Sequence, residues 1–269
     1  MTDGRMGGWA DGQRNDRPSA PLPICLTKFR PMPVDILAIA AHRDDVELTC
    51  AGTLIRAVDR GYRAGILDLT AGETGSRGSA ELREEEAQRA AAVMGIHERR
   101  NAGLQDAHLQ NSNEMRRVVV AEIRHFRPRV VILPFPIGRH PDHRIAAELG
   151  RDACFLSGLA RYQPDTEPHR PHKILHALSY REDPVKPTFV VDISDQFDRK
   201  LAAIKCYASQ FDGAKAAGEI FPTGQDLYAL IETQNAHYGS LIRTRYGEPY
   251  FTQETVHVDD VMTLEVSSM

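Results

Sequence analysis

Two short polar clusters in the sequence contain residue types that could bind a metal ion and catalyse hydrolysis. The first is HRDDVE at residues 42–47, and the second is RHPDH at residues 139–143. Catalytic zinc takes three protein ligands and keeps one position open for water, whose pKa it lowers to about 7. His42, Asp45 and His143 supply two imidazoles and one carboxylate, which meets this requirement.

The spacing inside each cluster gives neighbouring residues different roles. A separation of three lets one tight turn direct His42 and Asp45 at a single ion, which leaves Asp44 free to act as the general base. Such a carboxylate can accept a proton from the attacking water and return it to a leaving amine. His140 lies three residues before His143, where it could stabilise an oxyanion or the leaving group. The pattern predicts metal-dependent hydrolysis of an amide.

Two other functions remain open on the residues alone. Asp44 and Asp45 could hold magnesium for phosphoryl transfer, because carboxylates suit that ion. Alternatively, the protein could be a non-catalytic Rossmann-like binder of a sugar or nucleotide, in which the histidines only shape the pocket. Two histidine ligands favour zinc over magnesium. The glycine-rich loop 71–78 lacks the GxGxxG and GxxxxGK[ST] patterns of nucleotide-binding loops.

Both clusters follow apolar runs that are typical of buried parallel strands, residues 34–41 and 130–135. The carboxyl ends of parallel strands meet at one edge of a sheet, where open α/β sheets bind their ligands, so the two clusters are expected to lie together. Further strands are predicted at 63–70, 173–180 and 188–193, with helices at 53–60, 80–94, 112–126, 143–157, 196–209 and 226–238. This alternation predicts a Rossmann-like three-layer α/β/α fold with a mostly parallel sheet.

Composition places these elements in one globular domain. The chain has 269 residues, of which 42% are hydrophobic and 26% charged, and we expect a single domain over 33–269 with a C-terminal elaboration. Residues 1–32, rich in Gly, Asp, Arg and Pro, are predicted to form a flexible N-terminal arm. A net charge of −4 argues against nucleic acid as a partner, and the absence of an apolar run of about 20 residues argues against membrane insertion. Four cysteines without a CxxC pair indicate a reduced, cytoplasmic protein.

The sequence around these residues also resembles that of a known protein family. AAHRDDVELTCAGTL and GRHPDH resemble the two metal motifs of the LmbE-like, or PIG-L, zinc N-deacetylases. LDLTAGETGSRGSAELREEEAQRAAAVMGI, LQD at 104–106, PTFVVDIS and CYASQF resemble the branch that contains the bacillithiol-pathway deacetylase of N-acetylglucosaminyl malate. The likeness runs from about Val34 to Phe211. It implies the LmbE-like fold, Zn²⁺ as the cofactor and an acetylated amino sugar as the small-molecule substrate.

The resemblance also implies roles for single residues. Arg83 and Asp106 occupy positions that contact substrate in the family, and Tyr228 is a candidate for a C-terminal tyrosine that contributes to some family sites. It further implies a homo-oligomer. Family members usually carry proline where this chain has Arg43, so we expect either a looser ligand turn or a cation near the mouth of the site. The most specific hypothesis is removal of acetyl from N-acetylglucosaminyl malate in bacillithiol biosynthesis.

Overall fold

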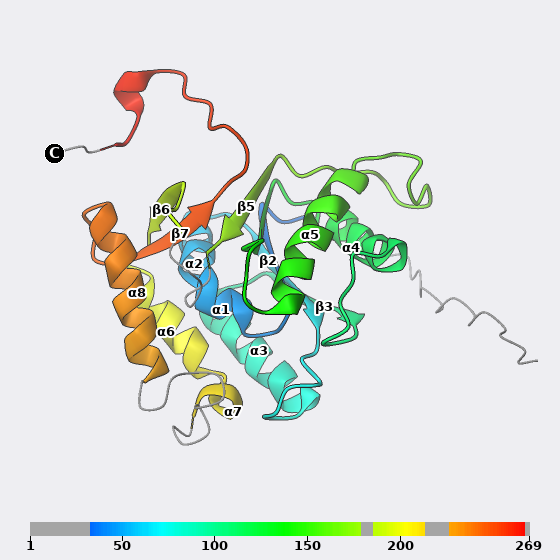
Figure 1. Cartoon of the computed structure of the whole chain (residues 1–269), viewed down its shortest axis with the longest axis horizontal. Helices are drawn as coiled ribbons and strands as arrows, with labels where there is room; N and C mark the ends of the chain where they lie inside the picture. The colour runs from blue at the N-terminus through cyan, green and yellow to red at the C-terminus, as the bar shows by residue number, and fades with distance from the viewer. Residues whose placement is uncertain (1–32, 179–184, 213–225, 267–269) are drawn as a thin grey trace, which may run out of the picture.

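A computed structural model describes residues 33–178, 185–212 and 226–266 of the chain. The predicted N-terminal arm, residues 1–32, lies outside the described residues. The described part is built on one seven-stranded sheet with helices on both faces (Figure 1). The strands are β1 (Ile36–Ala40), β2 (Ala64–Thr70), β3 (Glu98–Leu104), β4 (Val130–Pro134), β5 (Lys173–Ala177), β6 (Phe189–Asp192) and β7 (Gly247–Phe251). The predicted fold class is confirmed.

The strand order is β3-β2-β1-β4-β5-β7-β6. Neighbouring strands from β3 to β5 are parallel, whereas β7 is antiparallel to both β5 and β6. Because the order runs outward in opposite directions from β1 and β4, the switch point of this α/β sheet lies between these two strands. In their register Ile36 is opposite Val130 and Ala38 is opposite Ile132, so the carboxyl ends of β1 and β4 lie side by side.

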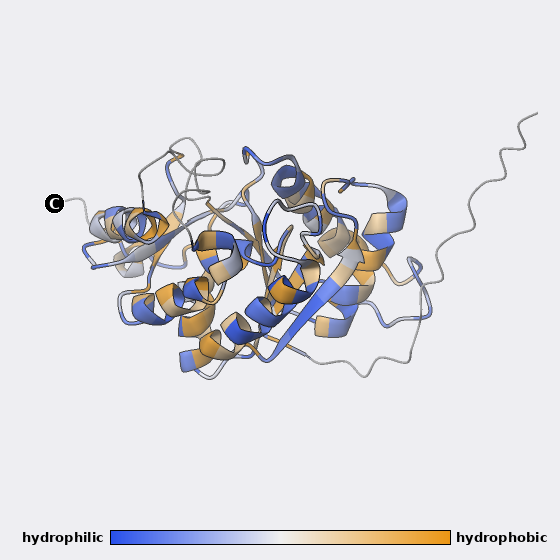
Figure 2. Ribbon diagram, turned by 90° about the horizontal axis from the view of Figure 1, so that it is seen from below, coloured by the Kyte–Doolittle hydropathy of each residue, from blue (hydrophilic) through white to orange (hydrophobic). Residues whose placement is uncertain are grey.

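The helices cover the two faces of the sheet in separate sets. They are α1 (Asp45–Thr49), α2 (Ala51–Asp59), α3 (Ala80–Met94), α4 (Asn113–Phe126), α5 (Pro141–Leu156), α6 (Phe197–Lys205), α7 (Ala208–Phe211), α8 (Leu227–Leu241) and the 3₁₀ turn η2 (Val261–Thr263). One core cluster joins α1, α2, α3 and α6 to the sheet, and a second joins α4 and α5 to the opposite face. Figure 2 shows the helices coloured hydrophilic on one side and hydrophobic on the other. None of the described helices is both long and apolar enough to span a bilayer.

Side chains of β1 explain why this strand is central. Ile36, Ala38 and Ala40 belong to the first core cluster, while Leu37 and Ile39 belong to the second. Successive side chains of a strand point to opposite faces, so a continuous apolar run fits a strand that is covered on both sides. The apolar run in the sequence predicts this position correctly.

The helix signals in the sequence are confirmed in detail for α3. The Ser79 side chain accepts a hydrogen bond from the Leu82 amide at the N-terminus, and Gly95 adopts a left-handed conformation at the C-terminus. Two strands, β3 and β7, lie outside the predicted set. The helix predicted at 196–209 is in fact two helices, α6 and α7, which are separated at Cys206 and Tyr207.

Candidate active site

The first polar cluster forms the turn between β1 and α1. The His42 amide donates to the Asp45 carboxylate over 2.9 Å, which closes the turn before the helix begins at Asp45. This bond brings the two side chains together, with His42 Nδ1 3.3 Å from Asp45 Oδ2. The separation of three residues therefore brings the side chains of His42 and Asp45 together.

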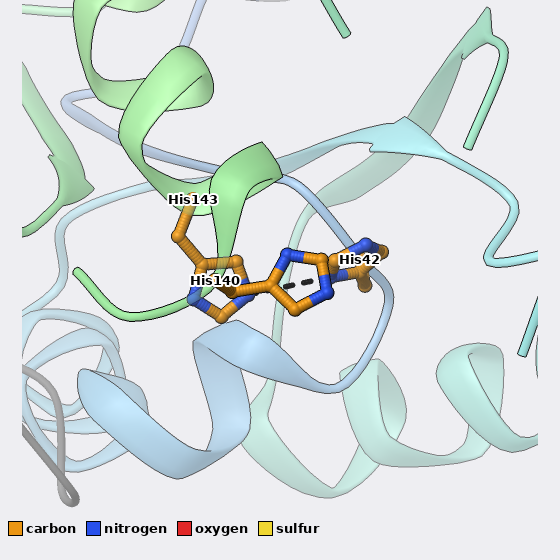
Figure 3. A group of neighbouring side chains, drawn as sticks. All are labelled: His42, His140 and His143. Atoms are coloured by element: carbon orange, nitrogen blue, oxygen red, sulfur yellow. Dashed lines mark hydrogen bonds between the residues drawn. The ribbon is translucent and has the colours of Figure 1, made fainter. Parts of the chain in front are cut away.

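The second cluster starts α5, at the end of the neighbouring strand β4. Pro141 occupies the first turn of the helix, and His140 caps it by accepting a hydrogen bond from the Asp142 amide at Nδ1. The first turn then places His143 Nε2 3.3 Å from His42 Nδ1 and 3.1 Å from Asp45 Oδ1. Figure 3 shows the three imidazoles gathered at this point, His143 from the first turn of α5, His140 from the residue before that helix, and His42 from the β1 turn.

The three predicted ligands fit a tetrahedral metal ion. Three donor atoms at about 2.0–2.1 Å from one zinc ion lie about 3.3–3.4 Å apart in a tetrahedron. His42 Nδ1 and His143 Nε2 are 3.3 Å apart, and each lies close to a different oxygen of Asp45, Oδ2 at 3.3 Å from His42 and Oδ1 at 3.1 Å from His143. Two imidazoles and one carboxylate are also the donor types of catalytic zinc sites. The residues present therefore suit the cofactor that the sequence predicts.

Two other groupings of side chains surround the same ring. His140 lies close enough to His42 and His143 to replace Asp45 as a third ligand. On the opposite side, His42 also groups with Asp106 and Asp142. In this second group the Ala107 amide already donates to both carboxylates, and His42 Nε2 lies 3.1 Å from Asp106 Oδ1. Donors thus already engage these carboxylates, which favours the Nδ1 side of His42 for a metal.

Asp106 contacts the Nε2 side of His42, whereas Asp45 and His143 lie at its Nδ1. One of its oxygens faces His42 Nε2, and the other accepts hydrogen bonds from the amide and hydroxyl of Thr74 at 3.0 and 2.6 Å. The hydrogen bond with His42 is the largest of the influences that lower the pKa of Asp106. A carboxylate in this position orients a metal-binding imidazole and fixes its tautomer. Asp106 was predicted to contact substrate. The structure places it in the wall of the cavity, with its oxygens engaged by these groups.

Burial and charge act in opposite directions on the ligand side chains. Burial alone would lower the pKa of His42 and of His143, but the Asp45 carboxylate, helped at His42 by Asp106 and Asp142, raises both above the usual value. Burial would likewise raise the pKa of Asp45, and the two imidazoliums hold it well below its usual range. In the metal-free protein the Asp45 carboxylate therefore favours the protonated form of both rings, and a metal ion has to compete with these protons.

Asp44 lines the same cavity but contacts Arg83 of α3. Its Oδ1 lies 3.3 Å from Arg83 Nη2, and both residues line the cavity. Arg83 is itself held by the Gly72 carbonyl, which accepts from Nη1 at 2.9 Å. Gly72 has a φ of +69°, and a Cβ at this position would lie 2.0 Å from the guanidinium, so only glycine permits the contact. The buried Arg83 therefore fixes the predicted general base.

The side chain of Arg43 does not reach the mouth of the site. It is 6% exposed, and it contacts the Ala80 carbonyl and the Glu84 carboxylate of α3. The expectation of a cation near the mouth is therefore wrong, because the Arg43 side chain packs against α3, whereas His42, Asp44 and Asp45 line the cavity. Glu86 on the same helix is buried and accepts hydrogen bonds from Ser209, which join α3 to α7.

A buried network beneath the turn lies outside the predicted site. Arg99 on β3 contacts Glu47 and Asp68 at 2.6–2.9 Å and also donates to the Arg43 carbonyl. The Tyr207 hydroxyl donates to the same carbonyl. Burial raises the pKa of Glu47 to about 7 despite the attraction of Arg99. Arg99 and Tyr207 thus both hold the backbone of the ligand turn at Arg43, the position where the family usually has proline. Glu47 falls within the HRDDVE motif, but the motif alone does not indicate these partners.

Tyr228, the third predicted substrate contact, is not brought to the cavity by the structure. It lies in the first turn of α8, its hydroxyl donates to Asp212 at 3.2 Å, and Lys205 lies over its ring. Among the described residues, the cavity wall on this side is formed by Gln210 and Phe211.

The site lies at one side of a cavity of about 360 Å³. The cavity extends from the loop after β2 across the ends of β1 and β4. Its polar wall consists of His42, Asp44, Asp45, Thr74, Ser76, Arg77, Arg83, Asp106, Arg139, His140, His143 and Gln210. A volume of this size and a polar wall on one side are typical of a small-molecule site.

Comparison with known proteins gives consistent results. The model of the PIG-L family, described as GlcNAc-PI de-N-acetylase, matches residues 37–154. Diacetylchitobiose deacetylase of Thermococcus kodakarensis is 30% identical over 229 residues, which cover 79% of this chain and 80% of that protein. A probable N-acetyl-alpha-D-glucosaminyl L-malate deacetylase 2 of Bacillus anthracis is 28% identical over 189 residues, which cover 65% and 81%. The conserved protein TT1542 of Thermus thermophilus has a TM-score of 0.75 and 35% identity, covering 84% of this chain and 98% of that one.

The fold, the site and these relatives define a deacetylase, a hydrolase that acts on N-acetyl amide bonds. Within that class the chain belongs to the PIG-L family. The predicted family and enzyme class are both confirmed.

Proposed function

We propose that the protein is a zinc-dependent enzyme that removes acetyl from the 2-amino group of an N-acetylglucosamine conjugate. The observation that carries the proposal is the convergence of His42, Asp45 and His143, in which the two imidazole nitrogens lie 3.3 Å apart and each lies within 3.1–3.3 Å of one Asp45 oxygen. Two of the three donors are imidazole nitrogens, which suit zinc, whereas magnesium prefers oxygen ligands. The arrangement therefore favours zinc over the magnesium of a phosphoryl-transfer enzyme.

The surrounding residues have the positions that hydrolysis requires. Zinc held by these ligands would activate water and polarise the amide carbonyl. Asp44 accepts a proton from the attacking water and passes it to the departing amine, while Arg83 keeps its carboxylate directed into the cavity. His140 accepts a backbone hydrogen bond at Nδ1, so its neutral ring carries the proton on Nε2 and can donate to the oxyanion.

The proposed substrate is N-acetylglucosaminyl malate, which would place the enzyme in bacillithiol biosynthesis in the cytoplasm. The Bacillus anthracis relative supports this substrate, whereas the Thermococcus relative supports an N-acetylated chitobiose. Cys50, Cys154 and Cys206 are unpaired, in keeping with a reducing compartment. Arg77 and Arg139 line the cavity, and a guanidinium is the side chain that pairs best with carboxylates such as those of a malate group.

The test measures acetate release from a panel of sugars alongside the zinc content of the purified protein. The panel contains N-acetylglucosaminyl malate, N-acetylglucosamine and diacetylchitobiose. We expect about one zinc per chain and the highest kcat/KM with the malate conjugate. A higher kcat/KM with diacetylchitobiose would contradict the proposed substrate but agree with the proposed reaction. Stoichiometric zinc without acetate release from any member would overturn the function.

A further inference from the structure

The cavity has a second, apolar end that deacetylation alone does not require. Six residues from β1, β4, β5, α1 and the junction of α1 with α2 form this floor: Ala38, Ala40, Val46, Cys50, Ile132 and Ala177. All six are at most 3% exposed and belong to one hydrophobic core cluster, so the cavity enters the core of the molecule. Burial raises the pKa of the Cys50 thiol, which keeps this residue neutral and the floor uncharged.

The opposite end of the cavity is open and polar. Thr74, Gly75 and Ser76 in the loop after β2, and Arg139 before α5, line the cavity and are exposed. The ligand cluster adjoins the floor, because His42 follows β1, which carries Ala38 and Ala40, and Asp45 directly precedes the floor residue Val46. A substrate must enter past the polar rim and reach these residues before it meets the apolar floor.

The geometry of an amide decides which part of the substrate meets each end. The carbonyl carbon bears the sugar nitrogen on one side and the acyl chain on the other. When this carbon lies at the ligand cluster, the polar sugar fits the rim with its arginine side chains, and the acyl chain points toward the floor. A single methyl group covers little of a floor made by six apolar residues.

We propose that this floor, the acyl chamber, binds N-acyl groups longer than acetyl, and that the enzyme hydrolyses N-propionyl and N-butyryl amino sugars. The inference rests on the proposed function and extends its substrate class. In each turnover the oxygen of water bonds to the acyl carbon, the C–N bond breaks, and the nitrogen takes a proton. The products are propionate or butyrate and the free amine, and no oxidant or reductant is involved.

The decisive experiment compares chain lengths on the wild-type, zinc-loaded protein. The probes are the N-acetyl, N-propionyl and N-butyryl forms of glucosaminyl malate and of glucosamine, with the free amine as the measured product. We expect kcat/KM to stay within about threefold, or to rise, with each added methylene, because burial of a methylene favours binding. A loss of more than threefold per methylene, with acetyl still released, overturns the chamber and leaves the proposed function standing. No release from any probe overturns both.

Two variants test where the chain lies. Ala177→Val fills the acyl chamber from β5, and we expect the butyryl-to-acetyl ratio of kcat/KM to fall at least tenfold. Ala153→Val on α5 makes the same change at a buried alanine of the other core cluster, outside the cavity wall, and should leave the ratio unchanged. An unchanged ratio in a folded Ala177→Val protein, or an equal fall in both variants, contradicts the assignment. If Ala177→Val does not fold, the wild-type series decides alone.

Discussion

Asp44 and Asp45 are adjacent and chemically identical, but the structure gives them different neighbours. Asp45 lies between His42 and His143, with oxygens 3.1–3.3 Å from their nitrogens. Asp44 instead contacts Arg83 and faces the cavity. Asp45 is therefore placed to bind a cation, and Asp44 is placed to accept a proton.

This difference predicts different effects of substitution. Asp44→Asn should retain zinc but lose turnover by about 10²–10⁴-fold, as the removal of a general base does. Zinc content by elemental analysis and kcat by amine release measure the two effects. His143→Ala serves as the matched variant and should lose zinc itself. Full activity in Asp44→Asn would remove this residue from the mechanism, and full zinc content in His143→Ala would remove that ligand.

At the residue level, the sequence predicts which side chains meet but not where every one of them points. His42, Asp45 and His143 follow from two strand ends and one turn, because parallel strands deliver their carboxyl ends to a common edge. Arg43 and Asp106 show the limit of this reasoning. Their directions depend on α3 and on the loop that carries Thr74, which the local sequence does not place.

At the level of elements, β3 contributes Arg99, which donates a hydrogen bond to the Arg43 carbonyl in the ligand turn. The Arg99 side chain is 2% exposed and faces two buried carboxylates, Glu47 and Asp68. Removing one partner of such a group leaves uncompensated buried charge. The adjacent Arg100 pairs with Glu122 in a more exposed setting, with its side chain 24% exposed.

These neighbours give a matched stability test. Arg99→Met should lower the free energy of unfolding by about 3–5 kcal/mol, whereas Arg100→Met should cost at most about 1 kcal/mol. Urea unfolding followed by circular dichroism measures both values. Equal losses would show that the buried network contributes no more than an ordinary surface ion pair.

The two strands missed by sequence reasoning lack the usual apolar signal for physical reasons. β3 reads ERRNAGL, because it lies at the edge of the sheet and its arginines form ion pairs. β7 reads GEPYF and contains a glycine, a buried glutamate and a proline. Glu248 is tolerated inside because Lys200 and the amides of Gly52 and Thr53 surround its carboxylate at 2.7–2.8 Å. Such long-range partners cannot be inferred from a five-residue pattern.

For the whole molecule, the metal site joins two separate parts of the chain, the β1 turn and the start of α5. A ligand that binds only the folded state stabilises it, by about 2.7 kcal/mol when free zinc is at a hundred times its Kd. For a chain of this size that corresponds to about 5–10 °C in Tm. We therefore expect chelation to lower Tm by this amount, and zinc to restore it.

The effect should also depend on pH. In the metal-free protein the raised pKa values of His42 and His143 stabilise the fold below the unfolded value near 6.5, and this contribution is lost as pH rises through the folded values. Zinc requires the deprotonated rings, so its contribution grows over the same range. The difference in Tm between zinc-loaded and chelated protein should widen from pH 5 to pH 8 in thermal scans. A constant difference would argue against these histidines as ligands.

The position of β7 has a consequence for how the chain is made. Among the described strands, β6 pairs with β7 alone, yet β7 comes last in the sequence, at residues 247–251. During synthesis β6 therefore stays unpaired in this sheet until residues 247–251 have been translated. The carboxylate of Glu248, which receives the amides at the start of α2, also arrives only then. A premature stop codon before residue 247 would thus affect not only the far edge of the sheet but also the helix that follows the ligand turn.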